Sequence, residues 1–233
     1  MRILALDSSG TVACVALLED DILKAEYTVN NTLTHSQTLM PMLDETLGRI
    51  GWEIGSIELI ALAAGPGSFT GLRIGAGTAK GLAHALSIPV VPVPTLEALA
   101  FNACGITDVI APMMDARRSQ VYTGLYSFNG SGELMTIREG SACAVEEIAD
   151  AINDLGQRVV LLGDGADAYK EKLKELLKTE SLWLPAGSNR QRAASVGVLG
   201  YLKYLRGEAV SARDLVPEYM RLSQAERERK GSV

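Results

Sequence analysis

Along the first hundred residues, short apolar runs alternate with stretches whose apolar residues are spaced as on one face of a helix. The apolar runs predict strands at 2–7, 12–20, 22–30, 57–65 and 88–93. The helical spacing predicts helices at 34–51 and 70–86. The order is therefore strand, strand, strand, helix, strand, helix, with one further extended segment.

The second half of the chain repeats this order, which indicates a duplicated α/β unit. Its strands are predicted at 108–115, 121–128, 133–140 and 158–163, and its helices at 145–155 and 166–177. Asp7 and Asp115 hold equivalent places, each at the end of a first strand before a tight turn. The repeat resembles the actin, Hsp70 and sugar-kinase superfamily, in which two ribonuclease-H-like domains face each other across a nucleotide cleft. We divide the chain at 1–105 and 106–233, and leave open which half holds the helical pattern at 193–206.

Composition restricts the functions that this fold could carry. The net charge of −6 makes a poor binder of nucleic acid, because neutralising phosphates requires clustered Lys and Arg. The mixed-charge tail at 225–231 is predicted to be a solvated end. The three cysteines have no C-x-x-C spacing, which fits a reducing compartment. No run is long enough to span a membrane, and no signal peptide is expected at the start, so we expect a cytoplasmic protein.

The stretch "AAGPGSFTGLRIGAGTAKGLA" at 63–83 is rich in glycine and joins a strand to a helix. It matches neither a P-loop nor the G-x-G-x-x-G fingerprint, because its third glycine comes one residue late and no Lys follows at the required place. Ser68 or Thr70 at the helix start either caps the helix or helps to hold an anion on backbone N–H groups.

The helix that follows has a second face without charge. Opposite its core stripe lie small or apolar residues at 74, 77, 81 and 85, and each interior glycine costs about 0.8–1 kcal/mol relative to Ala. Close approach of another helix would offset that cost. The face packs either on a second protein or on the other half of this chain.

Several segments together resemble the bacterial TsaB (YeaZ) family over essentially the whole chain. The segments are "LALDSSGTVACVAL", "THSQTLMPMLDETL", "GPGSFTGLRIGAGTAKGLA", "MMDARRSQVYTGLY" and "LVPEYMRLSQAE". The resemblance implies a non-catalytic subunit of the machinery that makes N6-threonylcarbamoyladenosine at position 37 of tRNA. It implies a heterodimer with TsaD, the transferase subunit, through first-domain helices. It also implies a homodimer when alone, TsaE joining through the complex, and tRNA contact only through the complex.

The resemblance and the helical wheel together define an expected partner interface. Its members are Leu39, Met42, Leu43, Arg73, Ile74, Gly77, Thr78, Gly81 and Ala85. A vestigial nucleotide cleft is expected from Asp7, Ser8, Ser9, Asp115, Gly163 and Gly165. Weak ATP or ADP binding is left open there, but no cofactor is required and hydrolysis is not expected, because Arg117 and Arg118 stand where ATPases of this fold have glycines. For Asp7 and Asp115, simple turn capping is an equal alternative.

Two other functions are compatible with some features of the sequence. An ATPase or small-molecule kinase using the cleft is the main alternative. A metalloprotease is disfavoured, because the chain has neither HExxH nor the His-x-x-x-His of TsaD-like proteins. With only His35 and His84 as imidazoles, and its cysteines scattered, the chain is expected to hold no metal.

Overall fold

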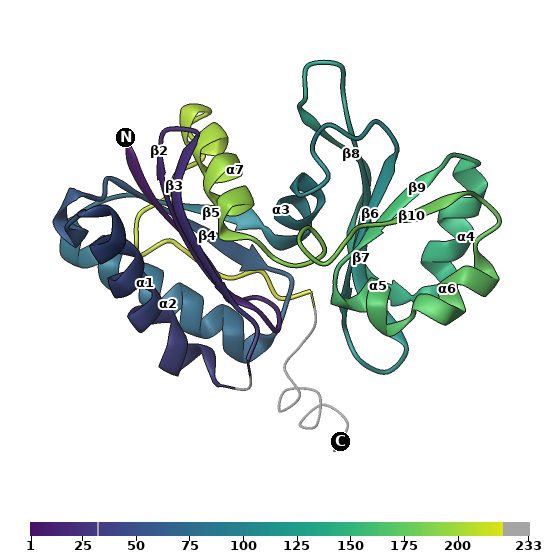
Figure 1. Cartoon of the computed structure of the whole chain (residues 1–233), viewed down its shortest axis with the longest axis horizontal. Helices are drawn as coiled ribbons and strands as arrows, with labels where there is room; N and C mark the ends of the chain where they lie inside the picture. The colour runs from purple at the N-terminus through teal and green to yellow at the C-terminus, as the bar shows by residue number, and fades with distance from the viewer. Residues whose placement is uncertain (32, 221–233) are drawn as a thin grey trace.

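The computed structural model describes residues 1–31 and 33–220 as two α/β halves, each built on a five-stranded mixed sheet (Figure 1). The tail at 225–231 lies outside the described residues. No helix within the described ranges is long and apolar enough to cross a bilayer.

The first sheet has the order β3-β2-β1-β4-β5. Its strands are β1 (Arg2–Asp7), β2 (Ala13–Glu19), β3 (Ile22–Val29), β4 (Leu59–Gly65) and β5 (Val90–Pro94). β1 pairs antiparallel with β2 and parallel with β4. β1 and β4 are buried over most of their length. Continuous apolar runs in β1 and β4 are the pattern expected for strands that are covered on both faces.

Helices cover both faces of the first sheet. α1 (His35–Ile50) and α2 (Phe69–Leu86) pack on one face, and a short 3-10 turn, η1 (Ile54–Ser56), follows α1. α7 (Ala193–Leu205) packs on the other face, so the helix whose place the sequence left open belongs to the first sheet. Gly197 and Gly200 allow this close packing, because a Cβ at either would overlap the side chain of Leu18 or Ala61.

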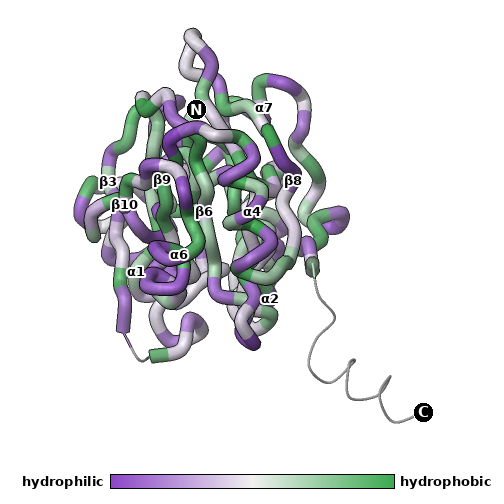
Figure 2. The backbone as a smooth tube through the Cα atoms, turned by 90° about the vertical axis from the view of Figure 1, so that its right-hand side faces the viewer, coloured by the Kyte–Doolittle hydropathy of each residue, from purple (hydrophilic) through white to green (hydrophobic). Residues whose placement is uncertain are grey.

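The second sheet has the order β10-β9-β6-β7-β8. Its strands are β6 (Val109–Asp115), β7 (Gln120–Phe128), β8 (Leu134–Ala144), β9 (Val159–Leu162) and β10 (Ser181–Trp183). α4 (Val145–Leu155), α5 (Asp164–Ala168) and α6 (Lys170–Leu176) belong to its outer side, where Figure 2 shows α4 and α6 beside β6 and β9. The prediction of two ribonuclease-H-like units is confirmed.

Two local predictions differ from the structure. The single helix predicted at 166–177 is two short helices, α5 and α6, separated at Tyr169, whose φ of −111° is not helical. A further helix, α3 (Thr95–Phe101), was not predicted. It connects the two halves and packs on the inner face of the second sheet.

After α7 the chain forms what we call the C-terminal strap, residues 208–220. Val210 pairs with Val90 at the edge of β5 through N–H···O bonds of 2.8 and 2.9 Å, and Leu215 is fully buried in the core beneath α1 and α2. The Glu218 amide donates to the Ala64 carbonyl at 2.7 Å, and Met220 then packs against the core between α3 and the second sheet. The strap therefore joins the first sheet to the second half.

Candidate partner surface and the cleft between the halves

The first glycines of the 63–83 stretch pack against the turn that follows β1. A Cβ at Gly67 or Gly71 would overlap the carbonyl oxygen of Ser9 or Ser8, and a Cβ at Gly75 would overlap the Ser8 hydroxyl. The Ser8 hydroxyl donates to the Gly71 carbonyl at 2.9 Å. These glycines are therefore required for contact within the chain, and they present no open loop to a phosphate.

Ser68 caps α2, as one of the two sequence interpretations predicted. Its hydroxyl oxygen accepts from the Gly71 amide at 3.3 Å, and its own amide donates to the Ser9 carbonyl at 2.7 Å. At the other end, Ser87 adopts the left-handed conformation with a φ of 55° and terminates the helix.

Gly77 and Gly81 differ from the earlier glycines because they face solvent. Both are exposed, and in the part of the chain that the structure describes a Cβ at either position would meet no atom within 4 Å beyond its own helix and chain neighbours. Arg73 and Ala85 are exposed beside them, and Ile74 and Thr78 are half-buried. The alternative that this face packs on the other half of the chain is therefore wrong. No contact among the described residues requires a glycine at 77 or 81.

For three residues of α1, the prediction that they belong to the partner interface is wrong. Leu39, Met42 and Leu43 are buried in the core between α1, α2 and the first sheet, so they are not available to a partner. Their helical spacing made them the core stripe of α1. The exposed face of α1 instead presents Met40, which is 46% exposed, and Asp44.

The expected nucleotide residues of the first half are enclosed. Asp7 is only 1% exposed, and its Oδ1 accepts from the amide and hydroxyl of Ser9 at 2.8 and 2.6 Å. Its Oδ2 has no hydrogen-bond partner among the described residues. Burial raises the pKa of this carboxyl to about 6, although the Ser9 hydrogen bonds act in the opposite direction. Asp7 therefore does cap the turn, and its second oxygen is buried without a partner.

The equivalent turn of the second half is also closed by its own residues. Asp115 Oδ1 accepts from the Arg117 amide at 2.8 Å and the Tyr169 hydroxyl at 3.3 Å. Arg117, Arg118 and Ser119 all have positive φ, between 55° and 64°. The carboxylate of Asp164 accepts from the Asp115 amide at 3.3 Å, and burial raises the pKa of Asp164.

Gly163 and Gly165, expected at an adenosine loop, are needed for packing against β6. A Cβ at Gly163 would overlap the Met113 carbonyl oxygen, and one at Gly165 would come within 2.8 Å of the Met114 carbonyl carbon. Gly163 also has a φ of +101° and donates its amide to Asn189 Oδ1 at 2.6 Å. Both glycines are thus explained without a ligand.

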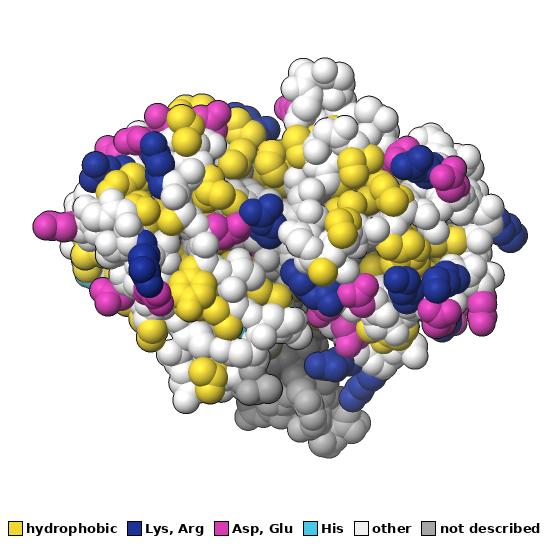
Figure 3. All heavy atoms as spheres, viewed as in Figure 1, with side chains coloured by type: hydrophobic (Ala, Val, Ile, Leu, Met, Phe, Trp, Pro, Cys, Tyr) yellow, Lys and Arg dark blue, Asp and Glu magenta, His cyan; other side chains and the backbone are white. Residues whose placement is uncertain are grey.

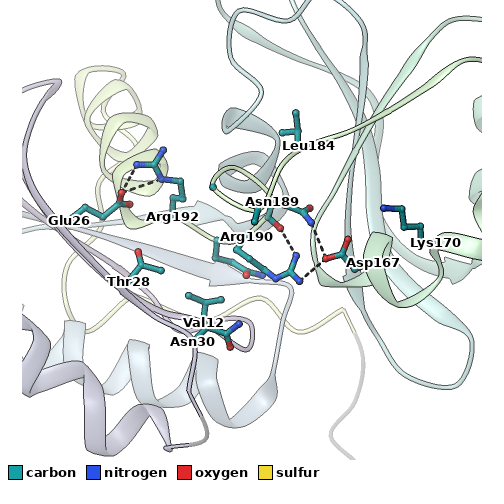
Figure 4. Close-up of a pocket in the computed structure, with 13 residues that line it drawn as sticks. Val12, Glu26, Thr28, Asn30, Asp167, Lys170, Leu184, Asn189, Arg190 and Arg192 are labelled. Atoms are coloured by element: carbon teal, nitrogen blue, oxygen red, sulfur yellow. Dashed lines mark hydrogen bonds and ion pairs between the residues drawn. The ribbon is translucent and has the colours of Figure 1, made fainter.

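A cavity of about 760 Å³ does lie between the halves, but none of the six expected nucleotide residues lines it. Figure 4 shows Glu26 and Thr28 of β3 on one side and Asp167 and Lys170 on the other. Two ion pairs occupy its wall, Arg192 with Glu26 and Arg190 with Asp167, the second at 2.7 Å. Most of its charge is therefore already neutralised within the chain.

The 188–192 segment lines the cavity and binds both halves, with Asn189 bonded to Gly163 of the second half. No motif in the sequence predicted this segment. The Asn102 amide donates to the carbonyls of Ser188 and Arg190 at 3.2 and 2.6 Å, and Cys14 Sγ donates to the Gln191 carbonyl at 3.1 Å. Gln191 is 1% exposed, and its side chain covers Gly10 in the turn after β1, where a Cβ on Gly10 would be 2.5 Å from Gln191 Nε2. The side chain of Gln191 therefore occupies the space next to Gly10 in this turn.

Comparison with known proteins agrees with this architecture. A family model described as TsaD, tRNA N6-adenosine threonylcarbamoyltransferase, matches residues 30–229. The chain is 34% identical to the Bacillus subtilis tRNA threonylcarbamoyladenosine biosynthesis protein TsaB, covering 97% of this chain and 96% of that protein. It is 30% identical to the Escherichia coli protein of the same name, with 95% of each chain covered.

A solved structure shows the same fold. The YeaZ structure from Pseudomonas aeruginosa superposes with a TM-score of 0.79 at 30% identity, covering 94% of this chain and 99% of that one. A ROK family protein from Streptococcus pneumoniae, at 11% identity and a TM-score of 0.51, shares the fold alone and covers 89% of this chain and all of that one.

The two repeated sheets and their helices define a member of the actin-like class of two-domain proteins. Within that class, the matches over nearly the whole length show that the chain belongs to the TsaB (YeaZ) family.

Proposed function

We propose that this protein is a non-catalytic subunit in the biosynthesis of tRNA threonylcarbamoyladenosine, and that it binds and activates a TsaD protein through the exposed face of α2. The names of its relatives support the pathway. On this proposal it forms a homodimer when alone, and TsaE and tRNA engage only through the complex. No cofactor is needed for that role.

The single observation that carries the proposal is the exposure of Gly77 and Gly81 in the interior of α2. Each costs about 0.8–1 kcal/mol of helix stability relative to Ala. Neither makes a contact with a residue in 1–31 or 33–220 that a Cβ would disturb. A face of small residues allows the backbone of another helix to approach closely. A partner helix would supply the contact that offsets this cost.

The cleft argues for a subunit without its own chemistry. Asp7 is buried, and Gln191 covers Gly10 in the same turn after β1. The turn after β6 carries Arg117 and Arg118, and Asp7 and Asp115 each accept a hydrogen bond within their own turn. Weak ATP or ADP binding stays a prediction. The rival reading, an ATPase or small-molecule kinase, requires the cleft to open. Phosphate release from Mg-ATP by the purified chain alone would favour that rival.

Substitution of Gly81 by Glu tests the partner surface. A longer side chain would separate the facing helices, and overpacking a tight contact costs about 1–3 kcal/mol. We expect Gly81→Glu to lower affinity for TsaD at least tenfold, to dissociate any homodimer in sedimentation, and to leave the thermal unfolding cooperative.

The matched control is Gly55→Glu in η1, where a Cβ also meets no atom within 4 Å. The control should bind normally. Unchanged association of Gly81→Glu, or a chain that no longer folds, would show that the face has no partner or belongs to the core.

A further inference from the structure

The C-terminal strap runs along α2 in the opposite direction. Residues 209–213 share a cavity of about 480 Å³ with Ala83, His84 and Ser87 at the end of α2. At the start of α2, the Phe69 ring contacts the ring of Tyr219, with centroids 5.0 Å apart. In Figure 1 the yellow segment accordingly passes beside α2 on its way to the second half. α2 therefore lies between α1 on one side and the strap on the other.

The side of α2 that faces the strap is cationic. Arg73 lies over the Phe69 ring, 3.9 Å from its centroid, and so extends the stack with Tyr219. Lys80 and His84 follow Arg73 on the same side at helical spacing, and α2 contains no acidic residue. Across the cavity, Arg213 is the one Lys, Arg, Asp or Glu among the lining residues. Within the described ranges, no ion pair involves Arg73, Lys80 or Arg213.

Apolar side chains are exposed along the strap. Val216 is 70% exposed and Tyr219 is 39% exposed. Among the described residues, neither acidic residue of this part of the strap, Asp214 or Glu218, forms an ion pair with Arg73, Lys80 or Arg213. Asp214 accepts from the Ser211 hydroxyl at 2.6 Å.

We propose that the strap is the second wall of the partner site, and that it selects a protein helix whose carboxylates meet Arg73 and Arg213 while its apolar residues cover Val216 and Tyr219. The proposal rests on the function proposed above and extends it from α2 to the C-terminal segment. Aromatic and Arg side chains in such a position commonly dominate binding energy. Unpaired cations favour a partner of opposite charge and discriminate against others.

Two other occupants fit less well. A second copy of this chain that met the site with its own α2 would bring no carboxylate on that helix. A nucleic acid would need more phosphate contacts than three fixed cations provide on a chain of net charge −6. On the face shown in Figure 3, basic and acidic side chains are interspersed without a continuous basic patch.

The test measures affinity of the full chain for the TsaD protein of the same organism by calorimetry, with variants at the strap. Arg213→Glu and Tyr219→Ala should each raise the Kd at least fivefold, and Tyr219→Phe should retain binding because it keeps the ring. Raising NaCl from about 0.05 to 0.5 M should weaken the wild type more than Arg213→Glu. The matched control, Lys178→Glu, reverses an exposed charge on the second half and should bind as the wild type does.

The outcomes separate the two proposals. If Gly81→Glu abolishes binding while Arg213→Glu and Tyr219→Ala stay within twofold of the wild type, the α2 surface stands and the strap proposal is wrong. If the wild type does not bind TsaD, both are wrong. If Arg213→Glu instead reduces tRNA binding by the lone chain, the cations serve a nucleic acid and the protein-helix reading is overturned. Circular dichroism of each variant excludes unfolding as the cause.

Discussion

The glycines of α2 should respond in opposite ways to the same substitution by alanine. At Gly81 the added methyl group meets open space, so Gly81→Ala should stabilise the isolated chain by about 0.8–1 kcal/mol through helix propensity alone. For a chain of this length that is a rise of about 2–4 °C in melting temperature. Gly77→Ala should behave in the same way, and the two gains should add because neither site has a packed neighbour.

At Gly71 the same methyl group would overlap the Ser8 carbonyl oxygen, and backbone must move to accommodate it. Overpacking of this kind costs about 1–3 kcal/mol, which exceeds the gain in propensity. Both substitutions gain the same helix propensity, so the predicted gap in unfolding free energy between Gly81→Ala and Gly71→Ala is the overpacking cost itself, about 1–3 kcal/mol. Urea unfolding of the monomeric chain measures it directly.

The binding of the same variants completes the test. Gly81→Ala should be more stable than the wild type and yet bind TsaD more weakly. The reason is that the added methyl group would hinder the close approach of the partner helix. A Gly81→Ala chain that is less stable than the wild type would refute the packing argument. One that is more stable and binds equally well would remove the reason given for the glycine.

Three further predictions concern the carboxyl group of Asp7, the metal content of the purified protein and its affinity for tRNA. Since folding raises the pKa of Asp7 from 3.8 to about 6, its burial costs stability above pH 6, and this cost disappears as the pH falls toward 4; the shift corresponds to about 3 kcal/mol. Asp7→Asn should remove this pH dependence. If urea unfolding gives the same change in stability between pH 4.5 and pH 7.5 for the wild type and for Asp7→Asn, the prediction is wrong. Purified protein should contain no stoichiometric transition metal, and elemental analysis finding about one Fe or Zn per chain would refute this. The lone chain should bind tRNA more weakly than about 1 µM at physiological salt, which filter binding can measure.

The order of strands and most helices could be predicted from the sequence because their periodicity is local. β1 and β4 are continuous apolar runs, and α2 has a clear core stripe. α3 was missed because seven residues after Pro94 give too short a pattern. The same periodicity misled the interface prediction on α1, since Leu39 and Leu43 mark the buried side of that helix.

Contacts between distant segments could not be predicted in this way. Gly71 and Gly75 look like Gly77 and Gly81 in the sequence, yet the first pair packs on a turn more than 60 residues earlier. The covering of Gly10 by Gln191 joins residues at opposite ends of the chain. Periodicity reports which face of a helix is apolar, but it does not report what that face meets.

The return of α7 to the first sheet has a consequence for how the protein is made. One face of β1, β2 and β4 is covered by Val196, Leu199 and their neighbours, which are synthesised after the entire second half. During translation this face of the first sheet therefore stays exposed to solvent until α7 has been synthesised, while the second half can already complete its own core. A fragment ending at residue 105 would keep the same bare face permanently, and we expect it to aggregate.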